Sequence, residues 1–476
     1  MDYLNLKNLI AGKEVEFGGK LRVSSEFYPN YSTQISDSTI FDIKMAISKA
    51  KTAAEKCNQM PFEERRKILQ NAAKKISFNS SDLEYIVRYT GMPITQVKKQ
   101  TGEVKAVLEI IPELIEKRIG IKYGKIARKP IDGENFFKFL HPIDGFLYAV
   151  TPANDPRVTA FVSAWAVSLG IPVVFKTAST DVLTAQKIIR AILDCGYPDA
   201  GLNQVCWDTK KIEKRRLNFD LVDSATAIWA FGEDKTVDAQ LRFEESEGSN
   251  VDHFANKIIL RHASGRSAGI YDDQYDNKKA AEIIAESALD WPIACNSMKT
   301  IFDTSTGHEL VEELKEKFSE YEKYIGDPLK ETTKVGYVNP RTNNHVYARI
   351  QDLERLGIMT RLKGIKIEDK QTSPILLQTD DVNSEFLNKE YGTYILAVKH
   401  CATFDDAVND ANYSAGDTHR LALSVFSDEE DKILKSVLRA HHIKRARHST
   451  ELDLMFHEGN DYLHKLTIPQ IHRVSF

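Results

Sequence analysis

The sequence has few cysteines and no paired metal-binding motif. Its five cysteines are scattered along 476 residues, and none forms a C-x-x-C pair. This pattern excludes a disulfide framework and a zinc signature. The thirteen histidines are also dispersed, and the one adjacent pair, His441-His442, points in different directions in either a helix or a strand. We therefore expect no metal site.

Long apolar runs and a strong net charge are also missing. No apolar run approaches the roughly 18 residues of a membrane span, and the segment from Met1 to Lys7 lacks the basic region and apolar stretch of a secretory signal. A net charge of -4 gives no electrostatic footprint for nucleic acid or for an anionic membrane. We predict a cytoplasmic protein that binds neither nucleic acid nor a membrane.

What is present is the composition of a soluble globular protein, with 42% hydrophobic and 28% charged residues. The length suffices for two or three domains, each with its own core. Apolar residues recur at helical spacing over residues 36–77, with a break at Met60-Pro61, and again over 81–89 and 96–116. We expect these helices to cover a sheet.

Residues 120–140 change to an alternating pattern around a turn at Asp132-Gly133. This pattern predicts a β-hairpin. Its exposed edge would need a partner strand, and oligomerisation would supply one. We therefore expect a homodimer or a homotetramer.

Strands then alternate with helices in both halves of the remaining chain. The predicted strands are 146–151, 172–176, 203–207, 226–231, 299–302, 374–377, 394–398 and 422–426, and the helices are 157–169, 180–195, 306–324, 345–356, 405–411 and 428–441. The alternation predicts βαβ units and two α/β domains, with ligands in a cleft at the carboxyl ends of parallel strands. A G-x-G-x-x-G fingerprint is absent from every βα turn.

One cysteine lies in a setting that suits a nucleophile. Cys295 follows a helical segment, 278–289, and a short turn that contains Pro292, and it precedes a strand. A thiol in a turn between a helix and a strand can face substrate while its neighbours stay packed. Only the thiolate form is a good nucleophile. The alternative is a small buried apolar residue.

Several segments resemble, in order and spacing, the motifs of the aldehyde dehydrogenase superfamily. The family motifs are T-P-x-N, V-V-x-K-P, the catalytic Cys after a helix, E-x-F-G-P, T-F-D-E-A and G-V-F-T. The corresponding segments here are Thr151-Pro-Ala-Asn154, Val173-Val-Phe-Lys176, Cys295, Lys389-Glu-Tyr-Gly392, Thr403-Phe-Asp-Asp-Ala407 and Ser424-Val-Phe-Ser427. Each motif is weak alone, but together they run along nearly the whole chain.

The resemblance implies an α/β fold with two doubly wound parallel-sheet domains and a β-hairpin oligomerisation arm. Residues 1–118 and 141–258 would form the dinucleotide-binding domain. Residues 119–140 and 455–476 would form the arm, and residues 259–454 the catalytic domain.

The resemblance also implies a covalent mechanism. The Cys295 thiolate would attack an aldehyde, and the Asn154 amide with the backbone N–H of Cys295 would stabilise the oxyanion. Hydride would pass to NAD or NADP, leaving an acyl-thioester on Cys295. Asn154 has an alternative role as a turn-forming residue before Asp155-Pro156.

His262 departs from the family pattern. By its spacing to the cysteine, the segment His262-Ala-Ser-Gly265-Arg266 replaces E-L-G-G-K, so a histidine stands where hydrolytic members have a glutamate base. Members that exchange acyl groups with coenzyme A need no water-activating base, because a thiol is the partner. His262 could itself serve as a base, or it could be a loop histidine without a chemical role.

The predicted cofactor contacts both match and depart from the family. Thr151 ends the predicted strand 146–151. Lys176 resembles the lysine that binds the adenosine ribose; the alternative is a surface residue at the end of a strand. Ser179 replaces a glutamate common in NAD-preferring members and leaves room for the 2′-phosphate of NADP. Glu390 stands beside the position of the ribose-binding glutamate, which Lys389 occupies.

After the strand at 226–231, Gly232 is followed by Glu233-Asp234 where the family has a T-G-S phosphate loop. Two carboxylates there would repel a pyrophosphate. The cofactor would then be held differently, or dinucleotide binding would be lost.

The sequence therefore predicts an NAD(P)-dependent oxidoreductase that interconverts a small-molecule aldehyde and an acyl-thioester, with coenzyme A as the acyl partner. Two alternatives stay open. One is a hydrolytic aldehyde dehydrogenase that releases a free carboxylic acid. The other is a non-catalytic member with a ligand-binding or structural role, which His262, Lys389 and the Glu233-Asp234 pair favour.

Overall fold

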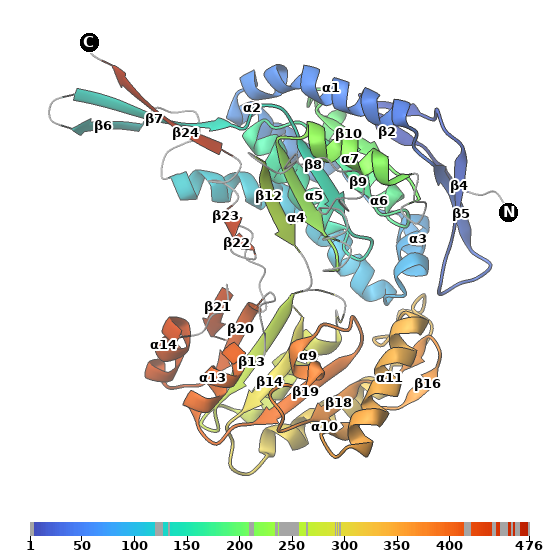
Figure 1. The fold of residues 1–476 in the computed structure, drawn as a ribbon, viewed down its shortest axis with the longest axis vertical. Coiled ribbons are helices and arrows are strands. Elements are labelled where there is room, and N and C mark those ends of the chain that lie inside the picture. The colour runs from blue at the N-terminus through green and yellow to red at the C-terminus, as the bar shows by residue number, and fades with distance from the viewer. Residues whose placement is uncertain are drawn as a thin grey trace, which may run out of the picture.

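The computed structural model describes residues 4–119, 127–131, 134–208, 214–233, 237, 257–262, 265–290, 292, 294, 297–413, 420–439, 444–447, 456–457, 460–461 and 467–474. Within these residues, two seven-stranded sheets lie one above the other in Figure 1, and a three-stranded arm projects from the upper half. Helices flank both sheets. The predicted α/β class with parallel sheets is thus confirmed.

The first sheet belongs to the N-terminal half. In spatial order its strands are β12 (Ile258–His262), β11 (Ala227–Phe231), β8 (Leu147–Thr151), β9 (Val173–Thr177), β10 (Leu202–Val205), β2 (Asn8–Ile10) and β3 (Lys13–Val15). The strands from β12 to β10 are parallel, and β2 and β3 continue the sheet in antiparallel pairing. All five residues of β8 and of β9 are buried, as expected for a parallel sheet covered on both faces.

The helices of this half follow the apolar periodicity of the sequence. They are α1 (Ile40–Gln59), α2 (Phe62–Lys75), α3 (Ser80–Thr90), α4 (Ile94–Ile119), α5 (Arg157–Leu169), α6 (Val182–Leu193) and α7 (Arg215–Ser224). The side chains of Asn79 and Asp82 cap α3 reciprocally, and Gly91 ends it in the left-handed region with φ of 71°. The break between α1 and α2 falls at Met60-Pro61, as predicted.

The second sheet belongs to the C-terminal half. Its strands are, in spatial order, β15 (Thr360–Lys363), β18 (Ile375–Gln378), β19 (Ile395–His400), β14 (Met298–Asp303), β13 (Arg266–Tyr271), β20 (Arg420–Phe426) and β21 (Lys444–Arg447). β15 is antiparallel and the others are parallel. The helices of this half are α9 (Asn277–Leu289), α10 (Glu309–Glu322), α11 (Pro340–Arg355), α12 (Glu385–Asn388), α13 (Phe404–Tyr413) and α14 (Glu430–Arg439).

The predicted hairpin consists of β6 (Ala127–Ile131) and β7 (Glu134–Pro142), and its partner comes from the same chain. β24 (Thr467–Val474) pairs antiparallel with β7 from Asn135 to Pro142, and the three strands extend away from the upper half (Figure 1). The predicted assembly into a homodimer or homotetramer through this arm stays a prediction, as do the three domain boundaries and the cytoplasmic location.

The remaining strands are short. They are β1 (Asn5–Leu6), β4 (Lys20–Ser24) and β5 (Ser32–Ser36), which form one small sheet, and the pairs β16 (Lys366–Glu368) with β17 (Gln371–Thr372) and β22 (Phe456–His457) with β23 (Asn460–Asp461). None of the helices in the described part of the chain combines the length and the apolar character needed to cross a membrane.

Candidate active site at the facing strand ends

The described members of the predicted site lie at strand ends and loops near the junction of the two sheets. β12 of the first sheet ends at His262, and the chain enters β13 of the second sheet at Arg266. Because only three residues separate these strands, the carboxyl edge of the first sheet must adjoin the amino edge of the second. The ends of β8, β9, β11 and β12 all lie on that carboxyl edge.

The strand ends define a long binding edge. Lys176 on β9 and His262 on β12 are separated by β8 and β11. Three inter-strand spacings of about 4.8 Å place these two residues about 14 Å apart along the edge. A ligand that contacts both must be extended, as a dinucleotide is, because a small aldehyde cannot cover that span.

Lys176 is a buried cation at the carboxyl end of β9. Its side chain is 7% exposed, and its ammonium lies 5.6 Å from the ring centre of Trp207. Burial lowers the pKa of Lys176, although the neighbouring Cys206 and Asp208 act in the opposite direction. Within the described residues no hydrogen bond or ion pair satisfies this ammonium. It is therefore ready to donate to a hydroxyl or phosphate of a ligand.

Two further predicted cofactor contacts lie beside Lys176. Thr151 pairs with Thr177 across β8 and β9, is 2% exposed, and has a buried hydroxyl oxygen without a hydrogen-bond partner in the described part of the chain. Ser179 is half-buried in the turn that leads to α6. The orphaned hydroxyl of Thr151 and the unpaired ammonium of Lys176 fit the hydroxyl-rich adenosine side of a nicotinamide dinucleotide.

The loop that carries Asn154 is fixed by an ion-pair network that the sequence did not reveal. Arg157, at the first position of α5, makes a bidentate contact with Asp155 (Nε to Oδ1 2.9 Å, Nη2 to Oδ2 2.8 Å) and reaches Glu103 on α4 at 2.5 Å. Burial alone would lower the pKa of Arg157, but the two carboxylates outweigh it and raise the pKa. Asn154 itself is half-buried.

His262 is packed among aromatic side chains. It is 3% exposed, and its ring centre lies 4.5 Å from that of Phe231 and 5.9 Å from that of Trp229. The backbone N–H of Gly232 donates to the His262 carbonyl at 3.0 Å, and Gly232 has φ of 150°. The adjacent Glu233 is exposed, so water screens its charge, whereas Asp234 lies outside the described residues.

Glu390, and not Lys389, is directed at the loop between the two sheets. The Glu390 Oε2 accepts from the backbone N–H of Gly265 at 3.0 Å. Lys389 turns away to Glu385, at 3.3 Å, with its side chain 65% exposed. The one-residue offset in the sequence motif therefore leaves a carboxylate beside the crossover from β12 to β13.

Cys295 lies outside the described residues, but both sides of its turn are described. Ala294 is 9% exposed and packs in a cluster with Val182 and Cys206 of the N-terminal half. Ser297 donates from its backbone N–H to the Ala294 carbonyl at 3.0 Å. The buried Lys299 donates to the Pro292 carbonyl and to the Ser297 hydroxyl. The residue that precedes Cys295 thus packs against the N-terminal half.

Three of the other cysteines are unsuited to nucleophilic chemistry. Burial raises the pKa of Cys57 to about 11, that of Cys206 to about 11 and that of Cys401 to about 12. These side chains stay protonated at neutral pH, and a thiol is a poor nucleophile. Cys195 is half-buried and lies two residues after α6, away from the carboxyl ends of the strands.

Comparison with known proteins identifies the class. The model of the aldehyde dehydrogenase family matches residues 18–442. Because this match covers most of the chain, the protein belongs to the aldehyde dehydrogenase family, and the resemblance drawn from the motifs is confirmed.

Individual relatives are distant. A mitochondrial delta-1-pyrroline-5-carboxylate dehydrogenase of Emericella nidulans is 24% identical over 222 residues, which are 45% of this chain but only 37% of that enzyme. A D-glyceraldehyde dehydrogenase (NADP+) of Picrophilus torridus is 22% identical over 412 residues, 83% of this chain and 78% of that enzyme. The crystal structure of an NAD-dependent aldehyde dehydrogenase from Sinorhizobium meliloti superposes with a TM-score of 0.83 at 18% identity, covering 100% of this chain and 95% of that one. These likenesses include proteins of both cofactor types.

Proposed function

We propose that this protein is an NAD(P)-dependent oxidoreductase that interconverts an aldehyde and an acyl-thioester through a covalent intermediate on Cys295. Asn154 acts as the oxyanion donor, and coenzyme A is the acyl partner. Thr151, Lys176 and Ser179 hold the adenosine side of the cofactor, while Gly232 and Glu390 lie along the rest of its path. When bound, the cofactor supplies the hydride acceptor for oxidation or the hydride donor for reduction.

The burial of His262 is the observation that carries this proposal. Where hydrolytic members of the family have a glutamate base, this chain has a histidine that is 3% exposed and packed on Phe231. A general base must reach a water molecule within about 3 Å of the carbon it attacks. A ring packed in an aromatic cluster is poorly suited to that task, so release of the acyl group to a thiol is favoured over hydrolysis.

The chemistry follows from the groups at the strand ends. The Cys295 thiolate forms a C–S bond to the aldehyde carbon, and the carbonyl electron pair moves to oxygen, where the Asn154 amide can donate to it. Loss of hydride from that carbon then gives the thioester. Attack by the thiolate of coenzyme A on the thioester carbonyl forms acyl-CoA and returns the electron pair to the Cys295 sulfur.

The experiment is an assay of aldehyde oxidation with a panel of short aliphatic and aromatic aldehydes, NAD or NADP, and with or without coenzyme A. We expect coenzyme A to raise the steady-state rate at least about 100-fold, because a missing general base typically costs that factor in hydrolysis. The Cys295→Ala variant should lose all turnover and keep its cofactor affinity. Equal rates without any thiol, or unchanged turnover in Cys295→Ala, would refute the assignment.

A hydrolytic aldehyde dehydrogenase is the second candidate, because Glu390 brings a carboxylate to the loop at Gly265. If Glu390 activated water, the wild type would produce free acid without coenzyme A, and Glu390→Gln would lose that activity about 100-fold or more. Under the leading proposal, Glu390→Gln instead weakens cofactor binding and leaves the dependence on coenzyme A intact.

A further inference from the structure

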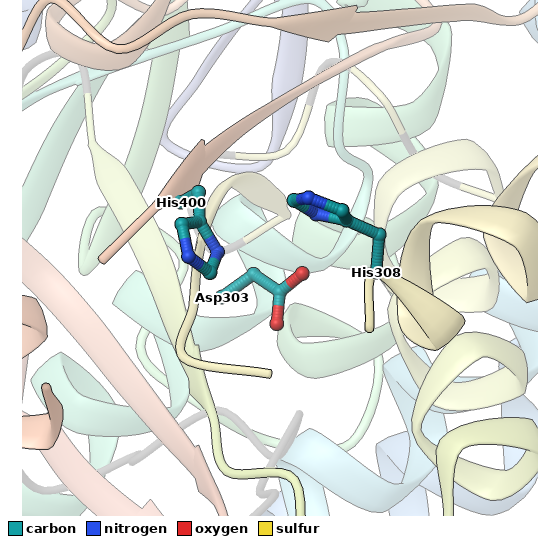
Figure 2. Close-up of side chains that lie close together, drawn as sticks. All are labelled: Asp303, His308 and His400. Atoms are coloured by element: carbon teal, nitrogen blue, oxygen red, sulfur yellow. The ribbon is translucent and has the colours of Figure 1, made fainter. Parts of the chain in front are cut away.

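Three metal-ligating side chains meet at the edge of the second sheet that faces away from the active site. Asp303 is the last residue of β14, and His400 is the last residue of β19, directly opposite Asp303 in the strand pairing. His308 immediately precedes α10. One ligand atom from each residue lies within 4.8 Å of the other two, and Figure 2 shows the carboxylate and both rings around one small space.

This cluster is separate from the active site. The turn that carries Cys295 enters β14 at Met298, whereas Asp303 ends the same strand. Five residues of extended chain at about 3.3 Å each place the two ends about 17 Å apart. A ligand at Asp303 therefore occupies neither the cofactor edge nor the nucleophile turn.

The buried Asp303 carboxylate needs a positive partner. Asp303 is 0% exposed. Its Oδ1 accepts from the backbone N–H of Ser305 at 2.9 Å, but its Oδ2 is buried without a hydrogen-bond partner in the described part of the chain, and so is Nδ1 of His400. Unsatisfied polar atoms in such a place are costly unless a ligand binds them.

The backbone holds two of the three ligands and leaves the third adaptable. The Asp303 carbonyl accepts from the Cys401 N–H at 2.8 Å, which locks the two strand ends together. His308 is exposed and has φ of 59°, a left-handed conformation that is uncommon outside glycine. Its ring centre lies 5.1 Å from that of His400 at an interplanar angle of 61°. Figure 2 shows the His308 imidazole beside that of His400 and close to the Asp303 carboxylate.

We propose that Asp303, His308 and His400 bind a divalent transition-metal ion of the Zn²⁺ type. Two imidazoles with one carboxylate suit Zn²⁺ and disfavour Mg²⁺ or Ca²⁺, which prefer oxygen ligands. Donor atoms around a tetrahedral Zn²⁺ lie about 3.3 Å apart at metal–ligand distances of about 2.0–2.1 Å. The exposed His308 side chain is free to rotate toward the other two donors, which lie within 4.8 Å of it. The ion then clamps the ends of β14 and β19 to the start of α10, and its fourth position is open to water.

Calorimetric titration of the full chain with ZnCl₂, after removal of metal with a chelator, tests the site. The titration uses the Cys295→Ser background, so that the nucleophile cannot bind zinc in its place. We expect one Zn²⁺ per chain and, in His308→Ala, at least about a 100-fold loss of affinity. His308 is exposed, so this variant should fold. The matched control is His345→Ala, which removes an exposed histidine of α11 in the same half and should leave the affinity unchanged.

A second measurement keeps the test independent of the titration. Zn²⁺ should raise the melting temperature of the wild type and of His345→Ala, because an ion that binds only the folded chain stabilises it. The rise should vanish in His308→Ala and His400→Ala. Less than one ion per chain, or equal affinity in His308→Ala and the wild type, would overturn the proposal and leave the trio as an acid–imidazole contact without metal.

Discussion

At the scale of single residues, the buried Lys176 is the cofactor contact of the proposal that most clearly affects stability as well as binding. A lysine ammonium buried without an acceptor is unfavourable in the folded chain, since burial disfavours its charged form. A ligand that accepts hydrogen bonds from the ammonium would offset this cost. The motif around Lys176 could be read from the sequence, because strand, lysine and turn are contiguous.

Replacing Lys176 with methionine should therefore separate binding from stability. In Lys176→Met we expect the KM for NAD(P) to rise about 10- to 100-fold, the value of one hydrogen bond to a charged group. The free energy of unfolding at pH 7 should increase by about 1 kcal/mol, because a buried charge is removed. Kinetics and urea denaturation measure the two effects. Lys74→Met, on the exposed face of α2, should change neither.

The lowered pKa of Lys176 also predicts how the free energy of unfolding depends on pH. The pKa of Lys176 is lowered in the folded chain from its ordinary value of 10.5, so the unfolded chain binds the proton more strongly between the two values. Stability must then rise as the pH increases through that window. The rise should be smaller in Lys176→Met by the contribution of this residue, and identical slopes would contradict the buried-charge interpretation.

The ion-pair network of Arg157 and the trio of Asp303, His308 and His400 could not be predicted, because residues that are distant in the sequence form them. Arg157 meets Glu103, which is 54 residues away in the chain. Asp303, His308 and His400 come together only because β14 and β19 are neighbours in the second sheet. Sequence spacing shows no metal motif in such a set, which is why no metal site was expected. The Lys389–Glu390 offset was visible, but only the structure decides which of the two side chains faces the loop.

At the scale of elements, the loop between β8 and α5 depends on Arg157 for its shape. The bidentate contact with Asp155 fixes the residue that follows Asn154, and the contact with Glu103 ties the loop to α4. If Asn154 is the oxyanion donor, its position relative to the nucleophile is set by this network. A displacement of about 1 Å at such a donor can lower the rate about 100-fold.

In Arg157→Met we expect kcat to fall about 10- to 100-fold while the affinity for the cofactor changes less than about twofold. The free energy of unfolding should drop by about 1–3 kcal/mol, since Asp155 is left partly buried without its partner. Arg157→Lys should recover part of the kcat. Lys75→Met, which removes an exposed pair with Asp194, should cost no more than about 0.5 kcal/mol. Equal effects on kcat in both methionine variants would contradict the positioning role.

Long elements were predictable and short ones were not, for a physical reason. Helix α5 begins and ends at Arg157 and Leu169, as expected, because thirteen residues give several helical turns of apolar periodicity. Strands β1 to β3 have only two or three residues each, which is too short for alternation to be visible. Their pairing partners lie far along the chain, as in the contact of Leu9 with Gln204.

At the scale of the whole molecule, the proposed reaction draws on both halves of the chain. In that proposal, the first sheet supplies Asn154 and the residues at its carboxyl edge that bind the cofactor, and the second half supplies Cys295 and Glu390. The chain crosses between them at 263–265 with a hydrogen bond from Gly265 to Glu390. The family, the fold and the facing strand ends are established. The proposal that coenzyme A, and not water, accepts the acyl group depends on the absence of a carboxylate at position 262.

Mass spectrometry of the intact chain and of its peptides, after mixing with an aldehyde and NAD(P) but without any thiol, shows whether the acyl group stays on the protein. We expect about one NAD(P)H per chain, followed by a stalled reaction, and a mass increase equal to one acyl group on the peptide that contains Cys295. Coenzyme A should discharge the adduct, and Cys295→Ser should form none. Continuous production of free acid with an unmodified Cys295 would show instead that water accepts the acyl group.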